Sequence, residues 1–335
     1  MIQIPDKYKN SWKDLKFIDL FAGIGGFHYA LQSFGAKCVF ASEWDEAAAK
    51  VYFNNFAMLP DGDITKIDES EIPPHDILCG GFPCQAFSIA GKQKGFEDTR
   101  GTLFFDIARI VDFHRPKILI LENVKNFISH DNGNTLKVVL NIINDLDYNS
   151  FYSILNASNF GLPQNRERFF LVAFDKSLGV TSFFFPNPRT EMTSVSKILD
   201  YAQSEIEPIS RNDIDIYKEF KVEQDIFGEK RLPNRPIQIG KVNKGGQGER
   251  IYHIDGHAIT LSAYGGGIGA KTGLYKVNGG IRRLTPRECA RVQGFPESHI
   301  LSENKNDSYK QFGNSVAVNV VQSIVLSIIR KLQNE

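Results

Sequence analysis

Short apolar runs and amphipathic helical patterns alternate through the first 175 residues. Apolar runs typical of buried strands occupy residues 16–21, 38–43, 76–81, 117–124, 150–157 and 168–174. Helical patterns lie at residues 27–35, 45–56, 103–113 and 135–146. This alternation favours parallel strands joined by crossover helices. The sequence therefore predicts an α/β fold with a doubly wound, Rossmann-like sheet.

The rhythm is lost from about residue 190 to residue 285, where Gly, Asn, Pro and basic residues dominate. A helical pattern at 285–295 and a long apolar stripe at 314–332 follow, and the stripe is suited to packing back against the first domain. A chain of 335 residues is long enough for one large domain and a smaller one. We expect a main domain of residues 1–190 and 286–335, with a smaller, loop-rich domain of residues 191–285 inserted into it.

Charge is balanced overall, with 39 Lys and Arg against 39 Asp and Glu, but it is unevenly distributed. Residues 229–283 hold ten basic residues against three acids, a net charge of +7. Residues 201–227 carry seven acids against three bases, a net charge of −4. The basic stretch is typical of a nucleic-acid-binding face, although a solvated face without a partner has the same composition.

The N-terminal stretch lacks the apolar core of a signal peptide, and no run of about 18 apolar residues occurs. The four cysteines, Cys38, Cys79, Cys84 and Cys289, show no CxxC spacing. This argues against a zinc site or a disulfide framework. We expect a soluble, unexported protein in a reducing cytoplasm, with no bound metal and no membrane association.

The sequence DLFAGIGG stands where the first predicted strand turns into a helix. Its glycines allow the backbone to approach a ligand, although a tight turn packed on the sheet also needs glycine. Glu43 ends the second apolar run, where an acid in such folds accepts hydrogen bonds from ribose hydroxyls. Asp63, in DGDIT, is predicted to end a third strand. These groups predict a bound nucleoside, and they do not separate a nicotinamide cofactor from S-adenosylmethionine.

A second group of reactive side chains is predicted at the same edge of the sheet. Cys84 follows a strand in GGFPCQAFS, Glu122 ends another strand in ILILENV, and Arg166 and Arg168 precede a third in QNRER. Taken singly, the cysteine is more consistent with a small buried apolar residue than with a nucleophile, and the charged groups are consistent with a cap and surface charges. Together they place a thiol, a carboxylate and two guanidinium groups near the cofactor turn.

Methylation of cytosine at C5 needs such a set, because C5 is too weakly nucleophilic to attack a sulfonium methyl group unaided. Thiolate addition at C6 converts the ring into an enamine with electron density at C5. A carboxyl group at N3 and the exocyclic amine stabilises the shift of charge, and a guanidinium group at O2 holds the base. After methyl transfer, the C5 proton is removed and the thiol is eliminated.

The motifs DLFAGIGG, GFPCQAF, ENV, QNRER, RECARVQGFP and FGNSV stand in this order along the chain. Together they resemble the motif series of the DNA cytosine C5 methyltransferase family, over nearly the whole chain. The resemblance implies an S-adenosylmethionine-dependent methyltransferase fold, with S-adenosylhomocysteine as product and no metal. It implies that Cys84 is the nucleophile, Glu122 the partner of cytosine N3, and Arg166 and Arg168 the catalytic-pocket arginines. The implied cofactor-binding residues are Phe21, Gly23, Ile24, Glu43, Trp44, Asp63, Ile64, Pro83, Leu103, Asn314 and Val316.

The inserted domain is predicted to read DNA, because a cytosine inside a duplex must be flipped out before a thiolate can reach C6. Gln247, in GGQGER, carries an amide suited to pairing with the orphaned guanine, and Arg250 suits a bidentate guanine contact. Thr260, Ser262 and Tyr264 alternate along ITLSAY, so a strand would point them to one face. The segments GGQGERIY and AITLSAYGGGI resemble the family members that modify the inner cytosine of GCGC, and this likeness adds Gly267 to the DNA-binding residues.

The loop GKQKGFEDTRG carries Lys92 and Lys94 between glycines and is interpreted as a lid over the flipped base, although a mobile surface loop has the same composition. Ala90 stands just before this loop, where the similar family members have serine. Any hydrogen bond from that serine to DNA is absent here. The difference affects the loop contacts and not the reaction.

Two other functions remain open at this point: a tRNA cytosine C5 methyltransferase and a catalytically silent DNA-binding regulator. The Gln247 and Thr260 segments favour DNA, and a silent regulator leaves the reactive set unexplained. An adenine N6 or cytosine N4 methyltransferase needs an Asp/Asn-Pro-Pro-aromatic tetrad, which the one Pro-Pro pair, in IPPHD, does not form. We expect a monomer acting on double-stranded DNA near the nucleoid, with a restriction endonuclease acting separately on the same site.

Overall fold

The computed structural model describes residues 1–82, 103–188, 193–201, 208–217, 219–220, 223–224, 230–231 and 233–334. The predicted nucleophile Cys84, the cofactor residue Pro83, and Ala90, Lys92 and Lys94 of the loop segment lie outside the described residues.

The chain divides into two compact units. We call the first the sheet unit; it comprises Gln3–Leu155, Glu167–Pro186 and Val321–Glu335. The second, the loop-rich unit, comprises Met1–Ile2, Asn156–Arg166 and Asn187–Val320. The chain therefore passes between the units within the QNRER motif, between Arg166 and Glu167.

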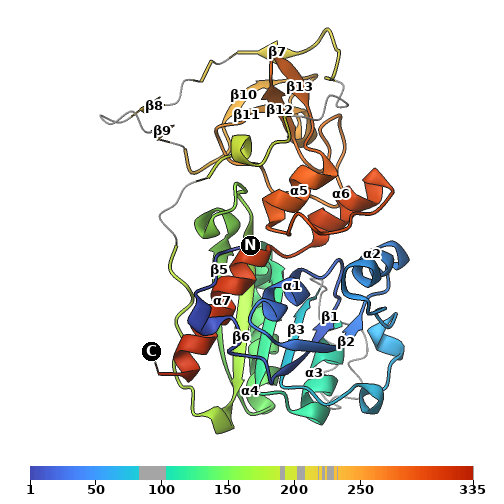
Figure 1. The fold of residues 1–335 in the computed structure, drawn as a ribbon, viewed down its shortest axis with the longest axis vertical. Helices are drawn as coiled ribbons and strands as arrows, with labels where there is room; N and C mark the ends of the chain where they lie inside the picture. The colour runs from blue at the N-terminus through green and yellow to red at the C-terminus, as the bar shows by residue number, and fades with distance from the viewer. Residues whose placement is uncertain are drawn as a thin grey trace. The chain divides into compact units, whose positions relative to one another are not determined.

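The sheet unit is built on one six-stranded sheet (Figure 1). Its strands are β1 (Lys16–Leu20), β2 (Lys37–Ser42), β3 (Ile77–Gly81), β4 (Ile118–Val124), β5 (Tyr148–Asn156) and β6 (Glu167–Asp175). They lie in the order β2-β1-β3-β4-β6-β5. Strands β1 to β4 pair in parallel, whereas β6 runs antiparallel to β4. Strand order reverses at β1, so the carboxyl ends of β1 and β3 form the switch point where such sheets bind ligands.

Helices pack on both faces of this sheet, which confirms the predicted doubly wound architecture. They are α1 (Gly26–Gln32), α2 (Glu46–Phe56), α3 (Leu103–His114) and α4 (Asn134–Asp145). Ile18 and Leu20 of β1 share a core with buried residues of α3 and α4. The alternate residue Phe17 faces the other way, with its ring 5.4 Å from that of His28 in α1. The period-two alternation of a strand places these neighbours on opposite faces.

The predicted strand at DGDIT is wrong. The described contact there is one isolated bridge between Ser42 and Asp61, and Asp63 instead caps the short 3-10 helix Ile64–Lys66 by accepting from the Thr65 backbone amide. Asp61 and Gly62 interrupt any apolar run, so this segment lacks the stretch of apolar residues that a buried strand needs.

The loop-rich unit has a smaller sheet in the order β13-β12-β11-β10-β7. Its strands are β7 (Asp215–Ile216), β10 (Gln238–Lys241), β11 (Arg250–His253), β12 (Leu274–Val277) and β13 (Gly280–Arg282), and a separate pair is β8 (Glu223–Gln224) with β9 (Lys230–Arg231). Ile239, Ile251 and Leu274 are fully buried at its core. The predicted strand at ITLSAY is not formed. Leu261 and Ala263 are nevertheless buried, whereas Thr260 and Ser262 are half-buried and Tyr264 is exposed.

Three helices follow: α5 (Pro286–Gln293), α6 (Lys305–Asn314) and α7 (Val318–Leu332). Thr285 and Glu288 form a reciprocal capping box at the start of α5. The predicted apolar helix at 314–332 is shorter than expected, because the chain leaves helical geometry at Ser315. In the part of the chain that is described, the stretch Lys305–Leu332 has the length and hydropathy of a membrane span, but 83% of its most apolar window is buried inside the structure. This burial is typical of a core helix.

Candidate functional site

The turn after β1 has three residues with positive φ, at alternate positions of the chain. Phe21 has φ +54°, Gly23 +55° and Gly25 +84°. A Cβ at Gly25 would lie 2.1 Å from the Phe56 ring, so only glycine fits there, whereas a Cβ at Gly23 would meet nothing within 4 Å. The turn is therefore tightly packed on the α2 side at Gly25 and open at Gly23. The space beside Gly23 is consistent with close approach of a ligand to the backbone.

Glu43 directly follows β2 and fixes this turn. Its two carboxylate oxygens accept hydrogen bonds of 2.8 Å each, from the backbone amides of Gly23 and Asp45. Burial raises the pKa of the Glu43 carboxyl, and the backbone amides oppose that rise. Each carboxylate oxygen has two lone pairs, so a carboxylate held in this way retains capacity to accept from the hydroxyls of a ribose.

The next predicted cofactor residues differ in exposure. The Trp44 side chain is 81% exposed, which leaves an aromatic face available for stacking, whereas Ile24 and Ile64 are buried. The Ile64 carbonyl accepts from Arg109 at 2.7 Å, and Arg109 also pairs with Glu69, so α3 holds the Asp63–Ile64 segment in place. Hydrogen bonds from Thr65 lower the pKa of Asp63, and this keeps the carboxylate ionised.

The other predicted cofactor-binding residues that the structure describes are far from one another in the sequence. Leu103 begins α3 and packs against the core of the sheet unit. Asn314 is the exposed last residue of α6, and Val316 is buried in the break before α7. Both belong to the loop-rich unit. Their role in cofactor binding stays a prediction.

Asp19 was not singled out by sequence reasoning, and it lies fully buried in β1 beneath the turn. Its carboxyl accepts from the His28 backbone amide and lies 3.8 Å from the Cys79 sulfur. Burial raises the pKa of Asp19 well above its usual range, which favours the protonated form. The feature of the sequence that could have indicated Asp19 is an acid inside the otherwise apolar run KFIDLF. The contact between Asp19 and the first turn of α1 helps to fix the turn from below.

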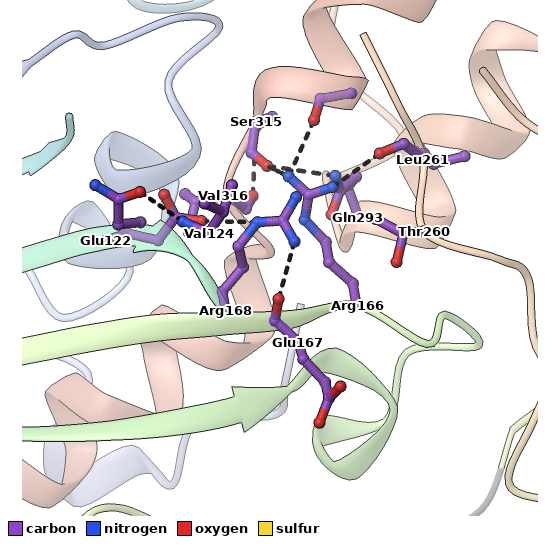
Figure 2. Close-up of polar contacts among 12 residues, drawn as sticks. Glu122, Val124, Arg166, Glu167, Arg168, Thr260, Leu261, Gln293, Ser315 and Val316 are labelled. Atoms are coloured by element: carbon purple, nitrogen blue, oxygen red, sulfur yellow. Dashed lines mark hydrogen bonds and ion pairs between the residues drawn. The ribbon is translucent and has the colours of Figure 1, made fainter. Parts of the chain in front are cut away.

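Glu122 and Arg168 form an ion pair on neighbouring strands, with 3.2 Å between Glu122 Oε1 and Arg168 Nε (Figure 2). Glu122 pairs in register with Gly81 at the end of β3, and a Cβ at Gly81 would lie 3.2 Å from Glu122 Oε2. The absence of a side chain at Gly81 thus gives the carboxylate its space. Burial lowers the pKa of Arg168, and Glu122 opposes that effect.

The chain leading toward Cys84 begins beside this pair. Asn123 Nδ2 donates to the Phe82 carbonyl at 2.9 Å, which anchors the last described residue before the predicted nucleophile loop. Cys84 follows Phe82 by two residues and is itself outside the described part of the chain. The described chain before Cys84 thus ends at a residue bonded to the neighbour of Glu122, and the convergence of Cys84 with Glu122 stays a prediction.

Arg166 has different surroundings from Arg168. Its side chain is buried, with the residue 2% exposed, and its guanidinium donates to three backbone carbonyls of the loop-rich unit. The acceptors are Leu261 at 3.0 Å, Gly313 at 3.0 Å and Ser315 at 2.7 Å (Figure 2). A direct contact between Arg166 and a substrate, as implied by the resemblance, stays a prediction.

A cavity of about 320 Å³ in the loop-rich unit collects three of the predicted DNA-reading residues. It is lined by Asn165, Pro236, Gln247, Arg250, Tyr252, Ile259 and Thr260. Arg250 is exposed, its Nε lies 3.4 Å from the Gly245 carbonyl, and its guanidinium also bonds the Tyr252 hydroxyl. We call this cavity the reading pocket.

Four residues of the reading pocket were not singled out by sequence reasoning: Asn165, Pro236, Tyr252 and Ile259. Asn165 belongs to the QNRER motif and bonds the segment that contains Thr260. Its backbone amide donates to the Ala258 carbonyl at 2.9 Å, and its carbonyl accepts from Thr260 Oγ1 at 2.5 Å. Tyr252 supports Arg250. The alternation of RIYH was a signal for Tyr252, whereas nothing local indicated that Asn165 meets a segment 95 residues away.

The other predicted DNA-reading residues do not line the reading pocket. The Ser262 hydroxyl donates to the Tyr264 carbonyl of its own segment, and the Tyr264 side chain is 74% exposed. Gly267 packs against Gly248, next to Gln247, because a Cβ there would lie 3.2 Å from the Gly248 carbonyl oxygen. Gly267 therefore supports the Gln247 loop from outside the cavity.

The basic stretch of residues 229–283 is less available than its composition indicates. Arg282 is buried in a bidentate ion pair with Glu288, at 2.8 Å. Lys244 and Arg250 remain exposed. Among the described residues there is no group of three His, Cys, Asp or Glu side chains placed to hold a metal ion.

Comparison with known proteins places these features in context. Residues 15–330 match the family model described as C-5 cytosine-specific DNA methylase. The chain is 54% identical over 330 residues to the Type II methyltransferase M.HhaI of Haemophilus parahaemolyticus, covering 98% of this chain and 97% of that protein. It is 45% identical to the Type II methyltransferase M.HpaII of Haemophilus parainfluenzae, covering 98% and 93% of the two chains.

Solved structures share the fold at lower identity. The Schizosaccharomyces pombe Dnmt2 methyltransferase superposes with a TM-score of 0.67 at 21% identity, over 96% of this chain and 100% of that one. A putative DNA modification methyltransferase encoded within an Escherichia coli prophage gives a TM-score of 0.69 at 22% identity, with the same coverage.

Proposed function

Because the chain belongs to the C-5 cytosine-specific DNA methylase family, we propose that it methylates C5 of the inner cytosine of GCGC in duplex DNA, with S-adenosylmethionine as methyl donor. The observation that carries the proposal is the ion pair of buried Glu122 with half-buried Arg168, beside Gly81 and three residues before Cys84. Its chemistry matches the activation that cytosine C5 requires.

The Cys84 thiolate is proposed to add to C6 of a flipped cytosine, which forms a carbon–sulfur bond and moves an electron pair toward C5. Glu122 holds the base at N3 and the exocyclic amine, and Arg168 orients Glu122 and reaches O2. C5 then forms its bond to the methyl group. Loss of the C5 proton returns the electron pair to the ring and expels the thiolate.

S-adenosylmethionine, when bound, supplies the methyl group from its sulfonium centre. The proposed site is the switch point of the sheet, where the turn at Gly23 is open, Glu43 is fixed by two backbone amides and the Trp44 face is exposed. Glu43 is suited to the ribose hydroxyls and Trp44 to stacking on the adenine ring. Asp63 and Ile64, held by Arg109, complete this side of the site.

The domain of residues 191–285 is proposed to read DNA through the reading pocket. Gln247 pairs with the orphaned guanine, and Arg250 contacts a guanine edge in the major groove. The names of the relatives as Type II methyltransferases support a place in a restriction-modification system, with a restriction endonuclease acting on the same site. We propose that the protein acts as a cytoplasmic monomer.

Tritiated methyl transfer to three substrates tests the proposal: a GCGC duplex, a duplex with one changed base pair, and tRNA. Transfer confined to GCGC is the expected result, and bisulfite sequencing should place the label on the inner cytosine. Transfer to tRNA alone, or to neither nucleic acid, would contradict the proposal. Methylation of another duplex sequence would retain the reaction and reject GCGC as the site.

The nucleophile has its own test in a duplex that carries 5-fluorocytosine at the target, where fluorine blocks the final elimination. Cys84→Ser should form no stable adduct, whereas Cys79→Ser should still form it, because Cys79 is fully buried in β3. An adduct that persists in the first variant and disappears in the second would overturn the assignment of Cys84.

A further inference from the structure

Arg166 joins two segments of the loop-rich unit that are far apart in the sequence. Its Nη1 donates to the carbonyl of Leu261, and its Nη2 donates to the carbonyls of Gly313 and Ser315. Leu261 lies between Thr260 and Ser262, and the other two acceptors flank Asn314. The sequence separations are 95, 147 and 149 residues. One buried cation therefore ties the predicted DNA-reading segment to the predicted cofactor-binding turn.

These two segments also touch directly at Gly313. A Cβ at Gly313 would lie 2.1 Å from the backbone nitrogen of Ala263 and 2.3 Å from the carbonyl carbon of Ser262. The nearest atoms are backbone and have no flexible side-chain end that can move aside. The two segments are thus in backbone contact, and Arg166 spans the same junction.

Two buried glutamines extend the junction. Gln293 Nε2 donates to the Phe312 carbonyl at 2.7 Å, and Gln164 Oε1 accepts from the Leu261 amide at 3.0 Å. The glutamines bond each other at 3.2 Å. A hydrogen-bonded chain thus runs from the Leu261 segment to the turn that begins at Phe312, in parallel with Arg166.

We propose that Arg166 is a positioning residue that makes residues 260–264 and 313–316 move as one body, so that binding of DNA and binding of cofactor strengthen each other. The inference rests on the proposed function, in which the first segment contacts DNA and the second contacts the cofactor. Arg166 suits this role because a planar guanidinium presents its donors in a fixed fork. The two arginines differ in their partners: Arg166 donates to backbone carbonyls, whereas Arg168 pairs with the carboxylate of Glu122.

The test measures the affinity for S-adenosylhomocysteine, the unreactive product, with and without a GCGC duplex. In the wild-type protein the duplex should tighten this affinity at least 5-fold, within the usual range for two coupled sites. Arg166→Lys retains the charge but presents its donors from a single nitrogen. It should keep each separate affinity within about threefold while the coupling falls below twofold, since coupling needs the two segments to move together.

Arg291→Lys is the matched control, because Arg291 also belongs to the loop-rich unit and also donates to a backbone carbonyl, that of Ile198 at 3.0 Å. Its coupling should equal that of wild type. Gln293→Met gives a second route if Arg166→Lys fails to fold: it removes the donor to Phe312, leaves Arg166 in place and should reduce the coupling partially.

A folded Arg166→Lys with wild-type coupling overturns the inference, as does unchanged coupling in Gln293→Met when the lysine variant does not fold. Wild-type coupling combined with a slow single-turnover methyl transfer in Arg166→Lys also overturns it, because Arg166 would then act in the chemical step. A wild-type protein that methylates GCGC but shows no coupling rejects the inference and leaves the proposed function intact. Absence of methylation by the wild-type protein rejects the proposed function itself.

Discussion

Glu122 of the sheet unit and Gln247 of the loop-rich unit are placed by different means. Glu122 lies in β4, in register with Gly81 of β3 and Phe170 of β6, so ladder hydrogen bonds on both sides fix its position. Gln247 begins a three-residue 3-10 helix, and the loop around it is held by glycine contacts. The Gly248 carbonyl accepts from the Gly269 amide at 2.7 Å, and a Cβ at Gly248 would lie 2.1 Å from the Gly266 carbonyl oxygen.

The difference teaches that the two units suit different tasks. A group fixed by strand register on both sides moves little, which suits a reaction that needs precise placement. A group on interlocked loops retains the freedom to adapt to a bound duplex, and loops tolerate changes of sequence that alter specificity. We therefore expect substitutions in the sheet unit to change rate or stability, and those in the loop-rich unit to change sequence preference.

The largest effect is expected from Glu122→Gln. The neutral amide can still accept from Arg168 but cannot fill the proposed role of Glu122 in stabilising charge at cytosine N3, so single-turnover methyl transfer should fall about 100-fold or more. Thermal unfolding should change little. Glu167→Gln is the control, since Glu167 is exposed and pairs with Lys125 on the surface. A matched loss of stability and rate in Glu122→Gln would assign this carboxylate to folding instead.

Gly25→Ala should destabilise the sheet unit by about 2 to 4 kcal/mol, measured by urea unfolding. The alanine would adopt a left-handed conformation and would press on the Phe56 ring. Gly62→Ala is the matched control, because a Cβ at Gly62 meets nothing within 4 Å. The preference for GCGC should be unchanged in both. Equal stability of the two variants would show that the turn does not depend on glycine.

Arg250→Ala should weaken binding to GCGC by about 1 to 3 kcal/mol and flatten the preference over a changed base pair, because the variant would lack the proposed bidentate guanine contact. Lys244→Ala is expected to weaken cognate and changed duplexes nearly equally, since a phosphate contact carries no sequence information. Titration of both duplexes at two salt concentrations measures these effects. Equal losses on the two duplexes for Arg250→Ala would leave the arginine as a backbone contact.

The smallest effect is expected from Tyr252→Phe, which removes the hydroxyl that supports Arg250. Binding to GCGC should weaken by about 0.5 to 1.5 kcal/mol, the usual contribution of one hydrogen bond. The effect should vanish in the Arg250→Ala background, as a double-mutant cycle would measure. An unchanged effect in that background would mean that Tyr252 acts independently of Arg250.

Strand and helix positions in the sheet unit were predictable because burial there follows a simple period. Ile18 and Leu20 face one layer and Phe17 the other, so apolar residues on both faces form the continuous run KFIDLF. The Gly turn and Glu43 follow directly from strand ends. Glu122 also lies where the end of ILILENV predicted it.

The break between α6 and α7 was not predictable from the same pattern. The apolar stripe of residues 314–332 favours one helix, but a continuous helix would use the carbonyls of Phe312, Gly313 and Ser315 for its own hydrogen bonds. In the structure these carbonyls accept from Gln293 and Arg166. The competing donors lie 19 to 149 residues away in the sequence, so no local pattern reveals them.

The reading pocket was predictable only in part. Gln247, Arg250 and Thr260 were identified from their side-chain chemistry and local pattern, whereas Asn165 reaches the pocket through a bridge between Gln164 and Ala258. The expected strand at ITLSAY did not form. The Leu261 amide donates to the Gln164 side chain and the Leu261 carbonyl accepts from Arg166, so neither group bonds to a neighbouring strand. Alternating burial survived this change because the segment remains packed on one side.

Helix α7 affects how the protein is made on the ribosome. Val321, Ile324, Val325 and Ile328 are fully buried, and Gln322 donates to Ser33 across 289 residues of sequence. At typical synthesis rates this separation corresponds to roughly 15 to 60 seconds of translation. During that interval the nascent sheet unit lacks the helix that covers one of its apolar surfaces. We therefore expect methylation to begin only after residue 321 has left the ribosome, and earlier nascent chains to be clients for chaperones.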